Sequence, residues 1–129
     1  MNVKLIDHVG IVVKDLGAAL ATYERNFDLN ADASRGGEVP ALAIKNAFMP
    51  IGCADLKFFS PTSEEGPVEK FVRERGEGIY MMSIEVDDLT SAIAHVRGLG
   101  ARVGEPVNGL AFVSMKATNG GNLQLVPRD

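Results

Sequence analysis

The chain has 129 residues, which predicts one domain able to bury roughly two-thirds of its unfolded surface. Its formal net charge of −4, with Lys and Arg scattered along the sequence, excludes the basic patch of a nucleic-acid-binding protein. No apolar run approaches the roughly 20 residues of a membrane span, and the lone Cys53 cannot form an internal disulfide, so we expect a cytoplasmic protein with no membrane partner.

One sequence pattern occurs twice. Residues 6–27 contain a β-branched run, a charged step at Lys14 and Asp15, and a Leu-led apolar repeat at helical spacing. At an offset of 73 residues the pattern returns around Asp87 and Asp88. Each copy therefore predicts a strand, a turn in which an Asp caps the next element, and an amphipathic helix. The predicted core positions of the two helices are Leu16, Leu20 and Tyr23 in the first and Leu89, Ile93 and Val96 in the second.

The first half begins with a predicted strand over residues 3–13. Alternation along this strand places His8, Gly10 and Val12 on one face, and the helix over residues 16–27 covers the other. A weak strand over residues 29–35, extended segments over 41–49 and 55–60, and a short helix that Pro67 can enter follow in order.

The second half repeats this plan, with strands over residues 79–86, 101–105, 110–115 and 122–126 and a helix over 89–99. The sequence thus predicts a single α+β domain of two tandem βαβββ units, residues 1–61 and 78–129, joined by a helix over 64–75. One helix covers one face of each unit, so we expect the remaining faces to form a curved sheet around a cleft. Such a cleft is a natural small-molecule site.

Three segments carry a resemblance to a known family: IDHVGIVVKDL at the start, GPVEKFVRERGEGIYMMSIEVDDLTSAI in the middle and GGNLQLV at the end. Together with the repeated units they resemble the vicinal oxygen chelate superfamily. Within it the sequence is most similar to methylmalonyl-CoA epimerases and more distantly to glyoxalase I and bleomycin-resistance proteins. The resemblance implies a homodimer that binds a small molecule.

In metal-dependent members of that superfamily, four inward-facing side chains hold a divalent cation. This cation polarises a substrate carbonyl or enolate. The resemblance places His8, Lys57, Met81 and Gln124 at these four positions. A Lys ammonium has no lone pair, and a Met thioether suits Cu(I) better than harder cations. We therefore predict that these degenerate positions hold no metal and that the protein uses no cofactor.

Because side chains alternate along a strand, Lys57 lies on the opposite face from Leu56 and Phe58 and is predicted to point into the cleft. There it is expected to anchor a carboxylate or phosphate, to reach the mouth of the cleft, or to pair with Glu85. The predicted ligand-binding residues are His8, Lys57, Phe59, Met81, Ser83 and Gln124.

Three functions follow from these residues. The first is metal-independent binding of a small acidic or acyl-thioester ligand, for sequestration or biosynthetic chemistry. The second is an epimerase-like or lyase-like reaction through an enolate, with His8, Lys57 and Glu85 as candidate catalytic residues. The third is an interaction protein with a vestigial cleft, in which His8 is merely held by a hydrogen bond. The sequence leaves all three open.

Overall fold

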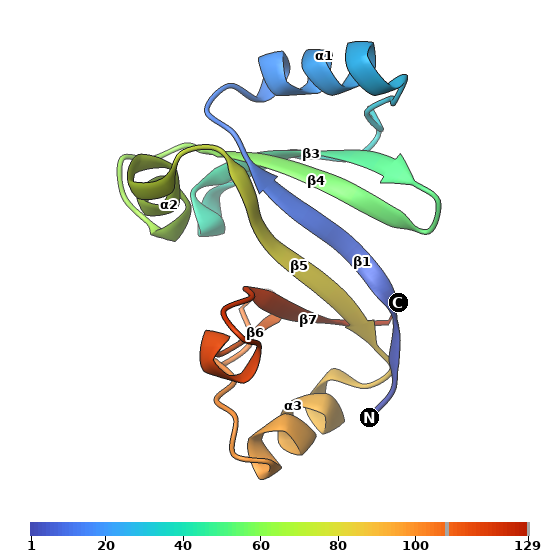
Figure 1. Ribbon diagram of the computed structural model, residues 1–129, viewed down its shortest axis with the longest axis vertical. Helices are drawn as coiled ribbons and strands as arrows, with labels where there is room; N and C mark the ends of the chain where they lie inside the picture. The colour runs from blue at the N-terminus through green and yellow to red at the C-terminus, as the bar shows by residue number, and fades with distance from the viewer. Residues whose placement is uncertain (108, 129) are drawn as a thin grey trace. The chain divides into compact units, whose positions relative to one another are not determined.

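A computed structural model describes residues 1–107 and 109–128 (Figure 1). The chain divides into two compact units. We call Met1–His8 together with Met81–Asp129 the terminal unit, and Val9–Tyr80 the central unit. The strands β1 (Val3–Val12) and β5 (Gly78–Val86) run from one unit into the other. Residues 108 and 129, which the predicted second βαβββ unit includes, lie outside the described residues.

The strands belong to one seven-stranded sheet in the order β2-β3-β4-β1-β5-β7-β6. The remaining strands are β2 (Gly37–Val39), β3 (Ile44–Ile51), β4 (Ala54–Pro61), β6 (Ala111–Val113) and β7 (Leu123–Pro127). The helices are α1 (Leu16–Phe27), α2 (Pro67–Arg75) and α3 (Leu89–Gly98). The predicted α+β fold with a repeated βαβββ order is confirmed.

The core of the central unit lies between α1 and the sheet. The Asp15 carboxylate caps this helix by accepting a hydrogen bond from the Ala18 N–H at 3.0 Å. Ile11, Val13, Met49 and Phe58 are buried here, and the helix residues Leu16, Leu20 and Tyr23 pack against them half-buried. The predicted orientation of the first strand and its helix is therefore confirmed.

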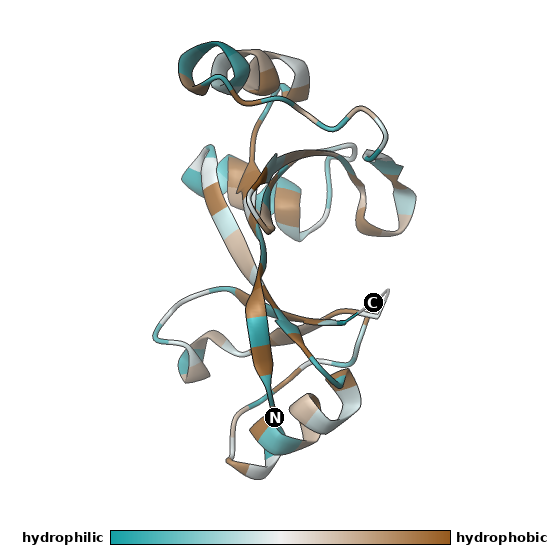
Figure 2. Cartoon of the chain, turned by 90° about the vertical axis from the view of Figure 1, so that its right-hand side faces the viewer, coloured by the Kyte–Doolittle hydropathy of each residue, from teal (hydrophilic) through white to brown (hydrophobic). Residues whose placement is uncertain are grey.

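The terminal unit repeats the arrangement. The Asp88 carboxylate accepts a hydrogen bond from the Ser91 N–H at 3.1 Å and caps α3. Ile93 is buried against strand residues such as Val86 and Leu125, and the helix residues Leu89 and Val96 pack at the margin of this core. Apolar and polar residues are mixed along each helix (Figure 2), as expected for helices with one buried face.

The predicted strand over residues 29–35 is wrong. The Asp32 carboxylate instead accepts hydrogen bonds from the Ser34 N–H at 3.0 Å and the Ser34 hydroxyl at 2.6 Å. These bonds to Ser34, together with the Arg35 guanidinium 2.9 Å away, lower the pKa of Asp32 to about 2. An Asp that bonds to the backbone two residues later favours a turn over a strand.

Three other predicted strands are shorter than expected. The strand predicted over residues 110–115 covers only Ala111–Val113, because Met115–Ala117 form a 3-10 turn. The strand predicted from residue 41 begins only at Ile44, because Pro40–Leu42 form a 3-10 turn and Ala43 adopts a positive φ of 52°. The strand predicted over residues 101–105 is reduced to a single bridge between Val103 and Val113. The helix predicted over residues 64–75 begins at Pro67. Among the described residues, no helix is both long and apolar enough to cross a membrane.

Candidate functional site

A buried set of hydrogen bonds joins three strands of the terminal unit. His8 on β1 is 5% exposed, and its Nδ1 atom lies 2.8 Å from the Asp7 carboxylate. On the other side of the ring, Nε2 lies 3.1 Å from Oγ of Ser83 on β5. The Ser83 hydroxyl, which is fully buried, donates to Oε1 of Gln124 on β7 at 2.5 Å. We call Asp7, His8, Ser83 and Gln124 the His8 network.

Strand pairing explains how this network is built. β5 and β7 are parallel, and their register sets Ser83 directly beside Gln124. Ile84 and Val86 point into the core under α3. Because side chains alternate along a strand, Met81, Ser83 and Glu85 occupy the opposite face of β5.

The protons of the network can be counted. Ser83 carries one hydroxyl proton, and it donates this proton to Gln124. His8 Nε2 must then donate to Ser83 Oγ, while Nδ1 lies 2.8 Å from the Asp7 carboxylate and shares a proton with it. If the Gln124 amide turned over, its N–H would point at Ser83 and the hydroxyl proton would point at His8 Nε2 instead. The proton position on His8 Nε2 and the orientation of Gln124 are therefore coupled.

Two further polar groups remain available in the terminal unit. The amide nitrogen of Gln124 and the carboxylate of Glu85 have no hydrogen-bond or ion-pair partner within this unit, as far as residues 1–8, 81–107 and 109–128 are concerned. Gln124 as a whole is 6% exposed. The network therefore ends on the amide N–H group of Gln124, with the half-buried Glu85 carboxylate two residues from Ser83 along β5.

The other predicted site residues lie in the central unit. Leu56 and Phe58 contact the core under α1, so Lys57 and Phe59 occupy the other face of β4, as the alternation predicts. The Lys57 Nζ atom lies 5.7 Å from the Phe48 ring centre and 6.0 Å from that of Phe59, within the range of a cation–π interaction. A common site for Lys57, Phe59 and the residues of the terminal unit stays a prediction.

The donor set differs from one that suits a divalent cation. Both His8 Nε2 and Gln124 Oε1 are hydrogen-bonded to the same Ser83 oxygen, and Met81 contributes only a buried thioether. Lys57 has no lone pair to offer. Among the described residues there is no group of three or more His, Cys, Asp or Glu placed to hold a metal ion. Divalent cations bind imidazole and charged oxygen donors most readily, so these residues do not fit the metal that the resemblance implies.

Sequence reasoning missed Asp7 and Phe48. Asp7 is the neighbour of His8 in β1, and neighbouring side chains in a strand normally point to opposite faces, so alternation gave no reason to connect them. The adjacent pair of a carboxylate and an imidazole was the available signal. Phe48 reaches Lys57 through the antiparallel register of β3 and β4, which sets these two residues opposite each other.

The fold and the network together define a class of protein. It is an α+β protein of paired βαβββ units whose strands carry a buried polar cluster. Residues 7–116 match the family model of the glyoxalase/bleomycin resistance protein/dioxygenase superfamily, and the chain belongs to this family. The resemblance seen in the sequence is confirmed.

Several similar proteins are methylmalonyl-CoA epimerases. The ethylmalonyl-CoA/methylmalonyl-CoA epimerase of Cereibacter sphaeroides is 29% identical over 124 residues, covering 89% of this chain and 91% of that protein. A variant of the methylmalonyl-CoA epimerase of Streptomyces coelicolor, solved in complex with 2-nitronate-propionyl-CoA, is 25% identical with a TM-score of 0.90 and covers 98% of both chains. A methylmalonyl-CoA epimerase in complex with methylmalonyl-CoA and NH4+ is also 25% identical, with a TM-score of 0.90, covering 98% of this chain and 95% of that one. Both of these structures hold a coenzyme A ligand.

Proposed function

We propose that this protein binds an acyl thioester of coenzyme A without a divalent metal. The observation that carries the proposal is the His8 network, in which Ser83 holds His8 and Gln124 by hydrogen bonds at 3.1 Å and 2.5 Å. Two positions expected to ligate a cation are thereby engaged with each other. Relatives at 25% and 29% identity that bind or act on acyl-CoA compounds supply the ligand class.

The network offers hydrogen-bond donors in place of a metal. The Gln124 amide N–H, which has no acceptor among the described residues of the terminal unit, suits a carbonyl oxygen, the acceptor that a thioester presents. The His8 imidazole, hydrogen-bonded to Asp7 and to Ser83, holds the Ser83 hydroxyl that orients this donor. Preorganised donors and charge in a buried site stabilise a carbonyl or enolate oxygen more strongly than they do in water.

Calorimetric titration tests the proposal directly. Propionyl-CoA or methylmalonyl-CoA should bind in the presence of EDTA, and added Co²⁺ or Mn²⁺ should leave the affinity unchanged. Gln124→Met should weaken binding by about tenfold, because Met has a shape similar to that of Gln but lacks the hydrogen-bond donor. His95→Ala is the matched control for His8→Ala, since His95 is an exposed histidine on α3. Metal-dependent binding that His8→Ala abolishes would overturn the proposal.

A second function is favoured by one observation. The Glu85 carboxylate lies on the Ser83 face of β5, half-buried and without an ion-pair partner in the described part of the terminal unit. A carboxylate in this state can serve as a general base toward the acidic α-proton of a thioester. This corresponds to the epimerase alternative. It predicts exchange of the α-proton of methylmalonyl-CoA in D2O, lost in Glu85→Gln while binding persists.

Exchange measured by NMR separates the two functions. Binding of methylmalonyl-CoA without exchange of its α-proton supports a binding function. Exchange that persists in Glu85→Gln shows that Glu85 is not the general base. In the latter case His8→Gln and Lys57→Met would identify the base by the same measurement.

A further inference from the structure

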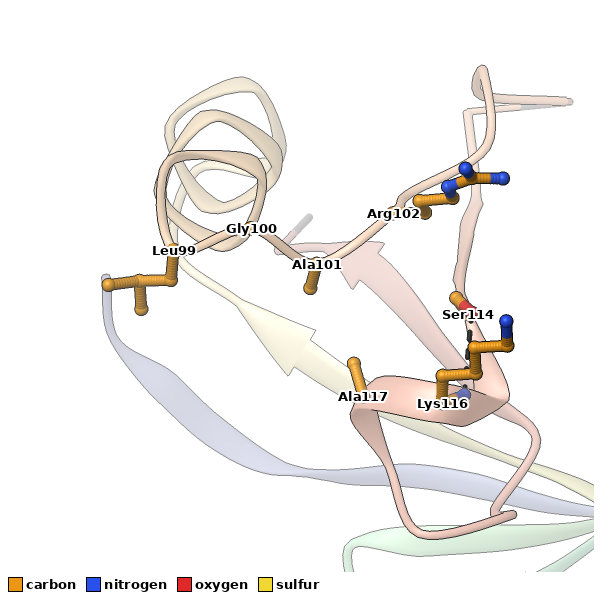
Figure 3. A pocket seen from close by; sticks show the side chains of 7 residues that line it. All are labelled: Leu99, Gly100, Ala101, Arg102, Ser114, Lys116 and Ala117. Carbon is orange, nitrogen blue, oxygen red and sulfur yellow. Dashed lines mark hydrogen bonds between the residues drawn. The ribbon is translucent and has the colours of Figure 1, made fainter.

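A separate pocket lies in the terminal unit, away from the residues of the His8 network. It is lined by the segment that leaves α3 and by the segment that follows β6, and its volume is about 330 Å³. Figure 3 shows Arg102, Ser114 and Lys116 along one side and the side chains of Leu99, Ala101 and Ala117 along the other. One wall is thus cationic and polar, and the other is apolar.

Backbone hydrogen bonds hold the two segments together. The Ser114 N–H donates to the Arg102 carbonyl at 2.8 Å, and the Gly104 N–H donates to the Phe112 carbonyl at 3.0 Å. The bridge between Val103 and Val113 lies between these bonds. Backbone pairing of the two segments therefore places Arg102 and Ser114 next to each other.

The two cations of this pocket differ from their neighbour Arg97 in having no partner among the described residues. Arg97, close by on α3, bonds to the Val103 carbonyl and to the Glu105 carboxylate. The side chains of Arg102 and Lys116 have no hydrogen-bond or ion-pair partner among residues 1–107 and 109–128, and no acidic residue lines the pocket. In a protein of net charge −4, two cations that line one pocket and have no neutralising partner in the described part of the chain create a local site for an anion.

A hydroxyl donor completes the polar wall. Ser114 Oγ accepts a hydrogen bond from the Lys116 N–H at 3.4 Å, and its own proton goes to no acceptor among the described residues. A guanidinium fork, an ammonium and a hydroxyl proton together match a tetrahedral dianion better than a planar, singly charged carboxylate.

We infer that this pocket binds the phosphate group of a phosphorylated organic ligand whose less polar part lies against Leu99, Ala101 and Ala117. The volume supports a ligand larger than free phosphate, because pockets for whole small molecules begin near 300 Å³. A free nucleotide is one source of such a group, and the nucleotide end of coenzyme A is another. The second source rests on the proposed function, whereas the first does not.

Titration calorimetry on the full chain distinguishes these sources. The probes are adenosine 3′,5′-bisphosphate, inorganic phosphate, propionyl-CoA, and propionyl-pantetheine, which carries no phosphate. Arg102→Gln and Lys116→Gln should each weaken adenosine bisphosphate binding about tenfold, and the affinity should fall as salt is raised. Arg128→Gln, a change of equal charge at an exposed residue of the same unit, should leave binding within about twofold.

The pattern of losses identifies the ligand. Weaker binding of both adenosine bisphosphate and propionyl-CoA in the two variants would assign the pocket to coenzyme A, and a loss for the nucleotide alone would assign it to a separate nucleotide. Unaltered affinities in both variants, or no binding of any phosphate compound at millimolar concentration, would overturn the inference. Propionyl-pantetheine reports on the proposed acyl site alone, so failure of one proposal is distinguishable from failure of the other.

Discussion

Ser83 Oγ lies 2.5 Å from Gln124 Oε1, at a point where the parallel register of β5 and β7 aligns the two residues. Ser83→Ala should destabilise the fold by about 1–3 kcal/mol, because it leaves buried groups of His8 and Gln124 without their shared partner. Urea unfolding measures this change.

Ser60 provides the control. It is 1% exposed on β4, and its hydroxyl is the one buried side-chain polar atom without a hydrogen-bond partner among the described residues. Ser60→Ala should leave stability within about 0.5 kcal/mol or raise it, since the variant no longer buries an unsatisfied group. Equal losses in the two variants would show that the Ser83 hydrogen bonds contribute nothing specific.

Helix capping gives a second prediction. Asp15→Ala and Asp88→Ala should each cost about 1 kcal/mol, since each removes the acceptor for an otherwise unpaired N–H in the first turn. Asp15→Asn and Asp88→Asn keep a capping oxygen and should recover most of the loss. Thermal unfolding of the four variants checks this order, and an Asn variant as unstable as its Ala counterpart would contradict it.

The Asp32 turn predicts a pH dependence. Hydrogen bonds from Ser34 and the adjacent Arg35 depress the pKa of Asp32 in the folded chain to about 2, below its ordinary value of 3.8. Its contribution to stability is therefore fully present above about pH 4 and is lost as pH falls through about 2. NMR titration of the Asp32 carboxyl carbon should show this low pKa, and Ser34→Ala should move the pKa upward. A titration midpoint near 3.8 in the native protein would rule out the turn.

Lys57 is predicted to anchor the anionic part of the ligand. Lys57→Met should weaken acyl-CoA binding by about 1.5–3 kcal/mol, the range for a charge-assisted hydrogen bond, while the melting temperature changes little. Lys45→Met, on the neighbouring strand β3 and exposed, is the matched control. If Lys57 is instead paired with Glu85, both Lys57→Met and Glu85→Gln should lower the melting temperature and leave affinity nearly unaltered.

The sequence predicted the features that depend on short-range chemistry. An Asp before a Leu-led repeat located both long helices and their caps, and alternation along β4 correctly separated Lys57 from Leu56 and Phe58. These signals depend on residues within one or two turns of each other, so a single sequence contains them in full.

The features that it did not predict depend on pairing between distant segments or on competing local bonds. The bond between Ser83 and Gln124 follows from the register of two strands that lie 41 residues apart, which no local pattern specifies. The turn at Asp32 replaced a strand because a side-chain oxygen competed with the sheet for backbone donors. Phe48 became a neighbour of Lys57 only through the hairpin register.

The division of the chain also has a consequence for the order of folding. Residues 9–80 are contiguous, so the central unit can complete its contacts while the protein is still being synthesised. Residues 1–8 emerge first but belong to a unit whose remaining residues begin at Met81. The hydrogen bond that holds the buried His8 imidazole joins residues 75 positions apart, so it can form only after Ser83 has been synthesised.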